Sequence, residues 1–296
     1  MMEVLSYFEN EAEKKQFVIE NELKYKFQIK EVAEKIVSEA PKFLLLSGAT
    51  CAGKTTTSHI LSDEITALGK HVKIISIDDF YFDREYTEEN NIDLESIDAI
   101  DLNCFKECAD RILEKKDTML PVFDFSSGKR IRYQKFSPHS DEIVVWEGIQ
   151  AFYPEILAVL PENTYKKIYL DMPKEIAICN KTFSPRDIRF YRRLVRDCKF
   201  RGADVNYVLE LWPNVIANEE KNMFPYSDSA DFFINTFLGY DLYVIKNYLL
   251  SELSYKNDRE KELYDDIKDY FNSIPSISSD YIPEDSLFRE FIGKKK

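Results

Sequence analysis

The sequence has no long apolar run, no C-x-x-C pair of cysteines and no histidine in a recognisable catalytic setting. Each absence argues against one class of protein. No apolar run approaches the roughly 20 residues that cross a bilayer, and the acidic start MMEVLSYFENEAEKK does not resemble a signal peptide. The five cysteines form no C-x-x-C pair and are expected to be reduced thiols. The three histidines are expected to be structural. These absences favour a cytoplasmic protein without a cysteine-bound metal.

Basic residues are outnumbered, which argues against nucleic acid and membranes as partners. The chain carries 40 Lys and Arg against 53 Asp and Glu, a net charge of −13, so its field should repel anionic polymers and lipids. Its 296 residues, 44% of them hydrophobic, can bury a full core in one large or two small domains. We therefore expect a small-molecule partner, no nucleic acid and no membrane, and leave a homo-oligomer open.

One stretch carries a strong motif. GATCAGKT fits the phosphate-binding pattern G-x-x-x-x-G-K-[ST] at every fixed position, after an apolar run at 43–46 and before helical apolar spacing at 56–68. Glycines let backbone N–H groups turn toward phosphate oxygens, and the following helix adds its dipole. The predicted nucleoside triphosphate site comprises Gly48, Ala49, Thr50, Cys51, Ala52, Gly53, Lys54, Thr55 and Thr56.

Acidic side chains follow two further predicted strands. The strand at 71–77 delivers Asp78 and Asp79, and the strand at 142–148 ends near Glu147. Because the carboxyl ends of parallel strands face the ligand crevice, these acids should lie beside the phosphate loop. We expect Asp78 to accept the proton of an attacking hydroxyl, whereas Asp79 could equally cap the next helix. Mg²⁺ is expected at Thr55, Glu147 and Asp78.

The alternation of strands and helices predicts an α/β fold, a P-loop NTPase with a doubly wound parallel five-stranded sheet. The other expected strands lie at 167–171 and 230–234, a hairpin at about 121–133, and a helix at 96–113. We expect an N-terminal helical extension at 1–40, a P-loop domain at 41–250, and a C-terminal helical extension at 251–296 that packs on it.

A basic segment interrupts the acidic chain. Residues 186–201, RDIRFYRRLVRDCKFR, hold seven basic side chains and two acidic ones. Such a run is often solvated surface, and a nucleic-acid footprint is a second alternative. Because a phosphate loop is present, we favour a helical arginine-rich lid, at about 184–225, that closes over the transferring group.

Taken together, these motifs resemble the uridine kinase and phosphoribulokinase family, in particular its bacterial uridine kinase-like nucleoside kinases. The resemblance runs from about Phe43 to Gly293 and rests on GATCAGKTT, ISIDDFY, NIDLESIDAID, PVFDF, VVWEGIQAF, RFYRRLVRDCKFRG and SLFREFIG. It implies ATP and Mg²⁺ as cofactors and a nucleoside as the phosphoryl acceptor.

The resemblance also implies individual roles. Asp78 would be the general base for the sugar 5′-hydroxyl, Glu147 would lie by the Mg²⁺, and Arg196 and Arg201 would hold the triphosphate. Catalysis is expected to depend on Asp78, Lys54 and Arg196. The implied nucleoside-binding set is Asp78, Tyr81, Asp93, Phe123, Phe125 and Arg193.

Three alternatives stay open at this point. Phe123 and Gly128 stand where uridine-cytidine kinases show Tyr and His, so the acceptor could be a purine nucleoside or another small alcohol such as a sugar phosphate. A nucleotide-dependent switch is disfavoured because Phe183 replaces the aspartate of a guanine-reading N-K-x-D element. A non-catalytic module that docks RNA through its arginines is the third alternative.

Overall fold

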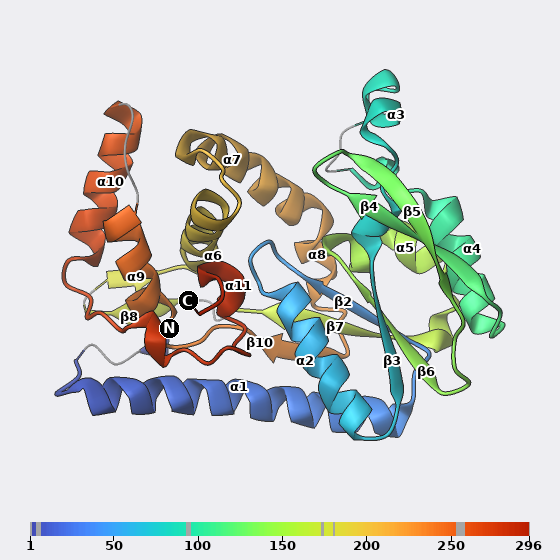
Figure 1. Cartoon of the computed structure of the whole chain (residues 1–296), viewed down its shortest axis with the longest axis horizontal. Helices are drawn as coiled ribbons and strands as arrows, with labels where there is room; N and C mark the ends of the chain where they lie inside the picture. Colours follow the sequence, from blue (N-terminus) through green and yellow to red (C-terminus); the bar gives the residue numbers. More distant parts are fainter. Residues whose placement is uncertain are drawn as a thin grey trace.

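The computed structural model describes residues 2–3, 7–92, 96–172, 175–179, 181–252 and 258–295. Its centre is a five-stranded parallel sheet, ordered β10-β7-β2-β6-β3 (Figure 1). This confirms the predicted fold class. The strands are β2 (Phe43–Gly48), β3 (His71–Ser76), β6 (Glu142–Glu147), β7 (Tyr165–Asp171) and β10 (Phe232–Asn235).

The sheet separates two hydrophobic cores. Along β2, Leu44 and Leu46 point into one core and Phe43 and Leu45 into the other, as expected for a central parallel strand buried on both faces. The first core is covered by α1 (Glu11–Glu39), α2 (Lys54–Ala67), α6 (Pro185–Val195) and α9 (Asp241–Glu252). The second is covered by α4 (Leu102–Leu113) and α5 (Pro154–Ala158).

A hairpin and a short helix stand beyond the edge strand. The strands β4 (Thr118–Asp124) and β5 (Lys129–Phe136) pair antiparallel, close to α3 (Arg84–Glu89) (Figure 1). Asp79 joins the hairpin to the end of β3, because its Oδ1 accepts a hydrogen bond of 3.0 Å from the backbone N–H of Phe123.

The basic segment lies between β7 and β10. The helix α6 begins at a capping box formed by Ser184 and Asp187 and continues as a π-helix over Arg196–Phe200. Two further helices follow, α7 (Val205–Asn222) and α8 (Phe224–Ser227). A small separate sheet, ordered β1-β8-β9, comprises β1 (Met2–Glu3), β8 (Ile176–Ile178) and β9 (Lys181–Phe183).

The C-terminal part returns to the P-loop domain. It contains α10 (Asp258–Phe271) and ends in the one-turn helix α11 (Arg289–Ile292), which lies between α2 and α6 (Figure 1). The long helix α1 packs along α2, where the hydroxyl of Tyr25 lies 2.7 Å from Thr57 Oγ1. The division into an N-terminal extension, a central domain and a C-terminal extension stays a prediction.

Two predicted helices begin later than expected. The helix predicted over 1–40 begins at Glu11, where Asn10 accepts from the backbone N–H of Glu13, and Met2–Glu3 pair as a strand with β8 instead. The helix predicted over 96–113 begins at Leu102, because Asp101 caps it by accepting from Cys104 N–H. In both cases a side-chain cap, rather than the apolar spacing, sets the boundary.

Within the described ranges, no helix combines the length and the apolar content that crossing a membrane requires.

Candidate active site

The phosphate loop joins β2 to α2 at the carboxyl end of the sheet. Gly53 caps α2 with a φ of 85°, a left-handed conformation that favours glycine. Gly48 is equally constrained, since a Cβ there would lie 2.8 Å from Leu170 Cβ. Lys54 Nζ donates to the carbonyls of Gly48 at 2.8 Å and Ala49 at 3.3 Å. The loop therefore has the strand, glycine and helix order that the motif predicts.

Two carboxylates approach the loop from neighbouring strands. Glu147 closes β6, which pairs with β2, and Asp78 lies in the 3₁₀ turn that follows β3. Burial raises the pKa of Glu147, Lys54 opposes the shift, and the charges of Asp78 and Glu290 add to it. The Lys54 ammonium and the carboxylates of Asp78 and Glu290 are therefore close enough to Glu147 to act on its charge.

Glu147 has an unused oxygen that suits a hard cation. Its Oε1 accepts a long bond of 3.4 Å from Ser76 Oγ, while its buried Oε2 has no hydrogen-bond partner among the described residues. The hydroxyl of Thr55 is exposed at the start of α2. Carboxylate and hydroxyl oxygens are ligands that Mg²⁺ accepts, so the residues present fit the predicted ion.

Asp79 does not cap the next helix. Its carboxylate accepts from Phe123 N–H, and burial raises its pKa. The capping alternative is therefore wrong for Asp79, because this side chain fixes the hairpin against β3. The charge of its neighbour Asp78 acts on Glu147 at the end of β6.

Three aromatic rings form a wall beside the strand-end acids. The ring centroid of Phe123 lies 5.7 Å from that of Tyr81 and 5.2 Å from that of Phe125. Gln150 Nε2 donates to the Tyr81 hydroxyl at 3.0 Å, which orients that ring. Phe125 is 61% exposed, so one face of the wall is open. The structure brings these predicted residues together, whereas Asp93 lies outside the described residues.

Three arginines of the basic segment turn inward. Arg189, Arg192 and Arg196 are buried, so the solvated-surface alternative is wrong for these three. Arg192 forms a buried ion pair with Asp241 and donates to Cys51 O in the phosphate loop at 3.1 Å. Their inward direction follows from the carboxylates that the surrounding helices present to them.

One carboxylate pairs with three arginines that the resemblance assigns to nucleoside or triphosphate binding. Asp197 lies 3.2 Å from Arg193 Nε, 2.7 Å from Arg196 Nε and 3.7 Å from an amino nitrogen of the largely exposed Arg201. Burial raises the pKa of the Cys51 thiol while Arg196 and Arg193 oppose the shift, so both guanidinium groups are close to the loop. Their roles toward ATP and nucleoside stay predictions.

Two glutamates that sequence reasoning missed occupy donors of the loop. Glu219 on α7 accepts from Thr50 N–H at 2.7 Å and also pairs with Arg189 at 2.8 Å. Glu290 on α11 accepts from Thr56 N–H at 3.3 Å and from its hydroxyl at 2.9 Å. These are N–H groups that such a loop offers to phosphate. A triphosphate that used these donors would have to displace both glutamates, because a phosphate and a carboxylate compete for the same N–H group.

The segment Ser286–Gly293, here called the C-terminal segment, covers the loop. A Cβ on Gly53 would lie 2.0 Å from Leu287 Cδ1, and the guanidinium of Arg192 lies over the Phe291 ring at 4.5 Å. The motif SLFREFIG in this segment contributes to the family resemblance, but the sequence alone does not predict where the segment lies in the fold. Its contacts make it part of the site.

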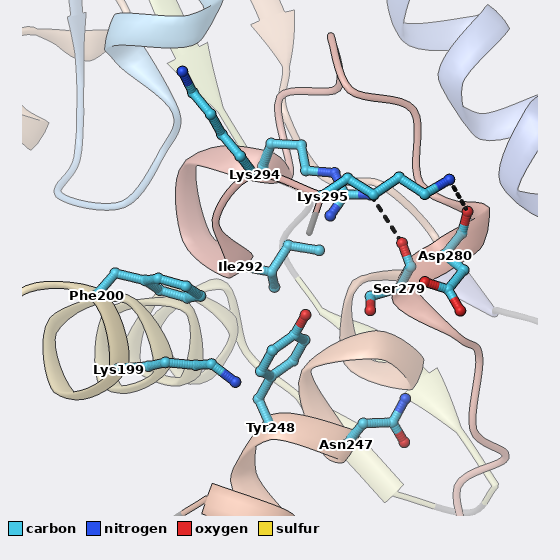
Figure 2. Close-up of a pocket in the computed structure, with 10 residues that line it drawn as sticks. Lys199, Phe200, Asn247, Tyr248, Ser279, Asp280, Ile292, Lys294 and Lys295 are labelled. Carbon is cyan, nitrogen blue, oxygen red and sulfur yellow. Dashed lines mark hydrogen bonds between the residues drawn. The ribbon is translucent and has the colours of Figure 1, made fainter.

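Two cavities flank this region. One, of about 250 Å³, opens beside the loop and is lined by residues that include Ala49, Asp171 and Arg189. The other, of about 350 Å³, lies beside α11, where Lys199, Tyr248 and Lys294 line it (Figure 2). Arg289 braces its wall by donating to Ser279 O at 2.9 Å.

A phosphate loop with carboxylates from two neighbouring strands and buried arginines above it defines a P-loop protein of the class that binds nucleoside triphosphates. Comparison with known proteins narrows this class. The chain belongs to the phosphoribulokinase / uridine kinase family, whose model matches residues 43–241. The resemblance predicted from the sequence is confirmed.

Two curated relatives and one solved structure illustrate the match. Uridine kinase of Saccharomyces cerevisiae is 28% identical over 232 residues, covering 75% of this chain but only 43% of that protein. Uridine kinase of Borrelia duttonii is 31% identical over 172 residues, covering 57% of this chain and 73% of the relative. A kinase of Silicibacter sp. TM1040 named for a fructose transport system superposes with a TM-score of 0.54 at 16% identity, covering 69% of this chain and 98% of that one. This last likeness concerns the fold alone.

Proposed function

We propose that the protein is an ATP- and Mg²⁺-dependent nucleoside kinase that transfers the γ-phosphoryl group to a 5′-hydroxyl, with a uridine- or cytidine-like acceptor. The observation that carries the proposal is the meeting of Lys54, Asp78 and Glu147 at one phosphate loop. The uridine kinases among its relatives support the choice of acceptor.

Each side chain has a defined task in this proposal. Lys54 leaves the loop carbonyls and binds the β- and γ-phosphates. Asp78 orients the 5′-hydroxyl and accepts its proton, and Arg196 neutralises charge that develops on the transferring group. Thr55 and Glu147 would hold Mg²⁺, which when bound would compensate the negative charge of the triphosphate.

The aromatic wall of Tyr81, Phe123 and Phe125 supports a planar acceptor. Rings of this kind hold a base by stacking without reading its edge. Gly128 has no side chain with which to read a base. Another residue would be strained there, because the φ is +67° and a Cβ would lie 2.9 Å from Arg84 Cβ. This observation favours a second candidate acceptor, a purine nucleoside or another small alcohol such as a sugar phosphate.

A substrate panel tests the proposal. Purified protein is incubated with Mg²⁺, ATP or GTP, and each of uridine, cytidine, adenosine, guanosine and ribulose 5-phosphate, and ADP or GDP release is followed. We expect release that depends on uridine or cytidine. Release with another acceptor alone would reassign the substrate, and tight GTP binding without any acceptor-dependent release would favour a switch. The cytoplasmic location and a homo-oligomeric state stay predictions from the sequence.

A further inference from the structure

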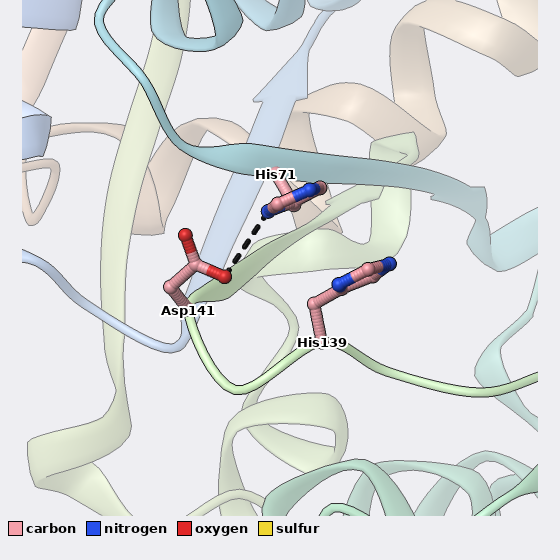
Figure 3. A group of neighbouring side chains, drawn as sticks. All are labelled: His71, His139 and Asp141. Atoms are coloured by element: carbon pink, nitrogen blue, oxygen red, sulfur yellow. Dashed lines mark hydrogen bonds and ion pairs between the residues drawn. The ribbon is translucent and has the colours of Figure 1, made fainter.

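Two histidines and one aspartate gather at the end of the sheet opposite the phosphate loop (Figure 3). His71 is the first residue of β3, and His139 and Asp141 lie just before β6, which pairs with β3 in a register that joins His71 to Glu142. One potential ligand atom from each side chain lies within 4.8 Å of the others. All three residues are exposed.

The backbone around this cluster is fixed. His139 N–H donates to Glu142 Oε2 at 3.0 Å, and Glu142 N–H donates back to His139 O at 3.2 Å. Lys42 Nζ donates to Glu142 O at 3.0 Å, which ties the same turn to the start of β2. The three side chains therefore stand on the first residue of β3 and on one braced turn, and ligands on rigid elements lose little freedom when they bind an ion.

The side chains lie close together but are not yet oriented as ligands. The two imidazole rings are stacked, parallel within 3° with centroids 4.0 Å apart, and His71 Nδ1 lies 3.1 Å from Asp141 Oδ1. Because an imidazole nitrogen binds a metal in the plane of its ring, one ring must turn about its side-chain torsions for both to reach one ion, and the exposure of the cluster leaves room for that rotation. The exposed Asp141 offers an ionised carboxylate at neutral pH, as a metal ligand must.

We propose that His71, His139 and Asp141 form a binding site for Zn²⁺ or a closely similar divalent transition metal. Two imidazoles and one carboxylate are a donor set of three-ligand zinc sites, in which water takes the fourth position. The exposure of the cluster leaves that position open. Imidazole nitrogen disfavours Mg²⁺ and Ca²⁺, which prefer oxygen ligands, so this site is chemically distinct from the predicted Mg²⁺ site.

An ion here would clamp the edge of the sheet. The strand β3 is one of the two edge strands of the five-stranded sheet, and Asp78 follows its other end. A metal that bridges His71 to the turn before β6 holds the start of this edge strand in register. Because the ion binds only the folded arrangement, it stabilises the fold in proportion to its concentration.

Titration of the full chain with Zn²⁺ in the absence of nucleotide tests the site. We expect one Zn²⁺ per chain by calorimetry, a rise in Tm with added Zn²⁺, and a visible absorption band when Co²⁺ replaces it. His139→Ala and Asp141→Asn should each weaken binding at least about tenfold, since even the loss of an outer partner of a metal ligand costs that much. His59→Ala is the matched control, because His59 is exposed on α2 away from the cluster.

The same titration has outcomes that overturn the proposal. Failure of wild-type protein to bind saturably would do so, as would unchanged affinity in a His71→Ala, His139→Ala double variant whose circular dichroism matches wild type. Cys104 and Cys108 are close enough to influence each other's pKa and offer a competing thiol site. Loss of binding in Cys108→Ser, with retention in the histidine variants, would move the metal to that helix and refute the assignment.

Discussion

At Glu147, the buried position that destabilises the folded protein is the same one that suits the residue to bind Mg²⁺. Its buried Oε2 lacks a partner among the described residues, and burial raises its pKa above the ordinary value of 4.5. An ionised carboxylate in such a place disfavours folding unless a cation joins it. The same unmatched charge is what suits the residue to hold Mg²⁺.

We therefore expect Glu147→Gln to raise Tm in Mg²⁺-free buffer and to lower kcat by about 100-fold. Because the folded pKa is raised, the wild-type protein loses stability as pH rises from the unfolded pKa through the folded one. The Tm advantage of the amide should grow over that interval and vanish below it. Thermal scans at several pH values, paired with kinase assays, measure both effects. An unchanged kcat would remove Glu147 from the metal site.

Three further residues are predicted to carry the transfer itself. Lys54→Ala, Asp78→Asn and Arg196→Ala should each lower turnover by roughly 100-fold or more, the usual scale for electrostatic and acid-base groups. Steady-state assays at saturating ATP and acceptor measure the change. A near-wild-type rate for Asp78→Asn would mean that positioning rather than deprotonation limits transfer, since Asp79 is occupied by the Phe123 N–H.

At the scale of elements, the C-terminal segment competes with the nucleotide. Glu290 accepts hydrogen bonds from the backbone N–H and from the hydroxyl of Thr56, and its negative charge would repel a phosphate at the same place. Glu290→Gln should therefore tighten ATP binding severalfold by removing that repulsion. Fluorescence titration with an ATP analogue measures it. Asp285→Asn is the control for net charge, because Asp285 pairs at the surface with Lys26. Weaker binding in Glu290→Gln would show that Glu290 supports the nucleotide instead.

Element boundaries show what the sequence could predict. Short apolar runs located all five strands of the central sheet, most clearly β2 and β6, which are buried on both faces and need no polar alternation. The phosphate loop followed from fixed glycine and lysine positions. The partners of that loop, Glu219 and Glu290, could not be predicted. They lie 169 and 234 residues away from the loop residues they bind, and nothing local marks a glutamate as a ligand.

At the scale of the whole molecule, carboxylates of the same chain pair with the buried arginines of the basic segment. Glu219, Asp241 and Asp197 take up the arginines of α6 and the π-helix that follows it. The outer surface therefore keeps the acidic character that the net charge of −13 implies. The core of the positive run, which was a candidate nucleic-acid footprint, is therefore internal, and of its basic side chains only those at its ends, Arg186 and Arg201, are exposed.

This charge distribution predicts that the protein does not bind RNA. Fluorescence anisotropy with a labelled single-stranded RNA should show no saturable binding at 50 mM salt, where a basic surface would bind most tightly. Binding that weakens steeply between 50 and 200 mM salt would contradict the prediction and support a docking module.

The central claim is that a triphosphate seated on Lys54 gives its terminal phosphoryl group to a hydroxyl beside Asp78. Transfer of radiolabel from γ-³²P-labelled ATP tests it most directly, with uridine and 5′-deoxyuridine as matched acceptors. The account predicts label in uridine monophosphate and none in the deoxy analogue. Label that appears only as inorganic phosphate, at equal rates with both compounds, would contradict it.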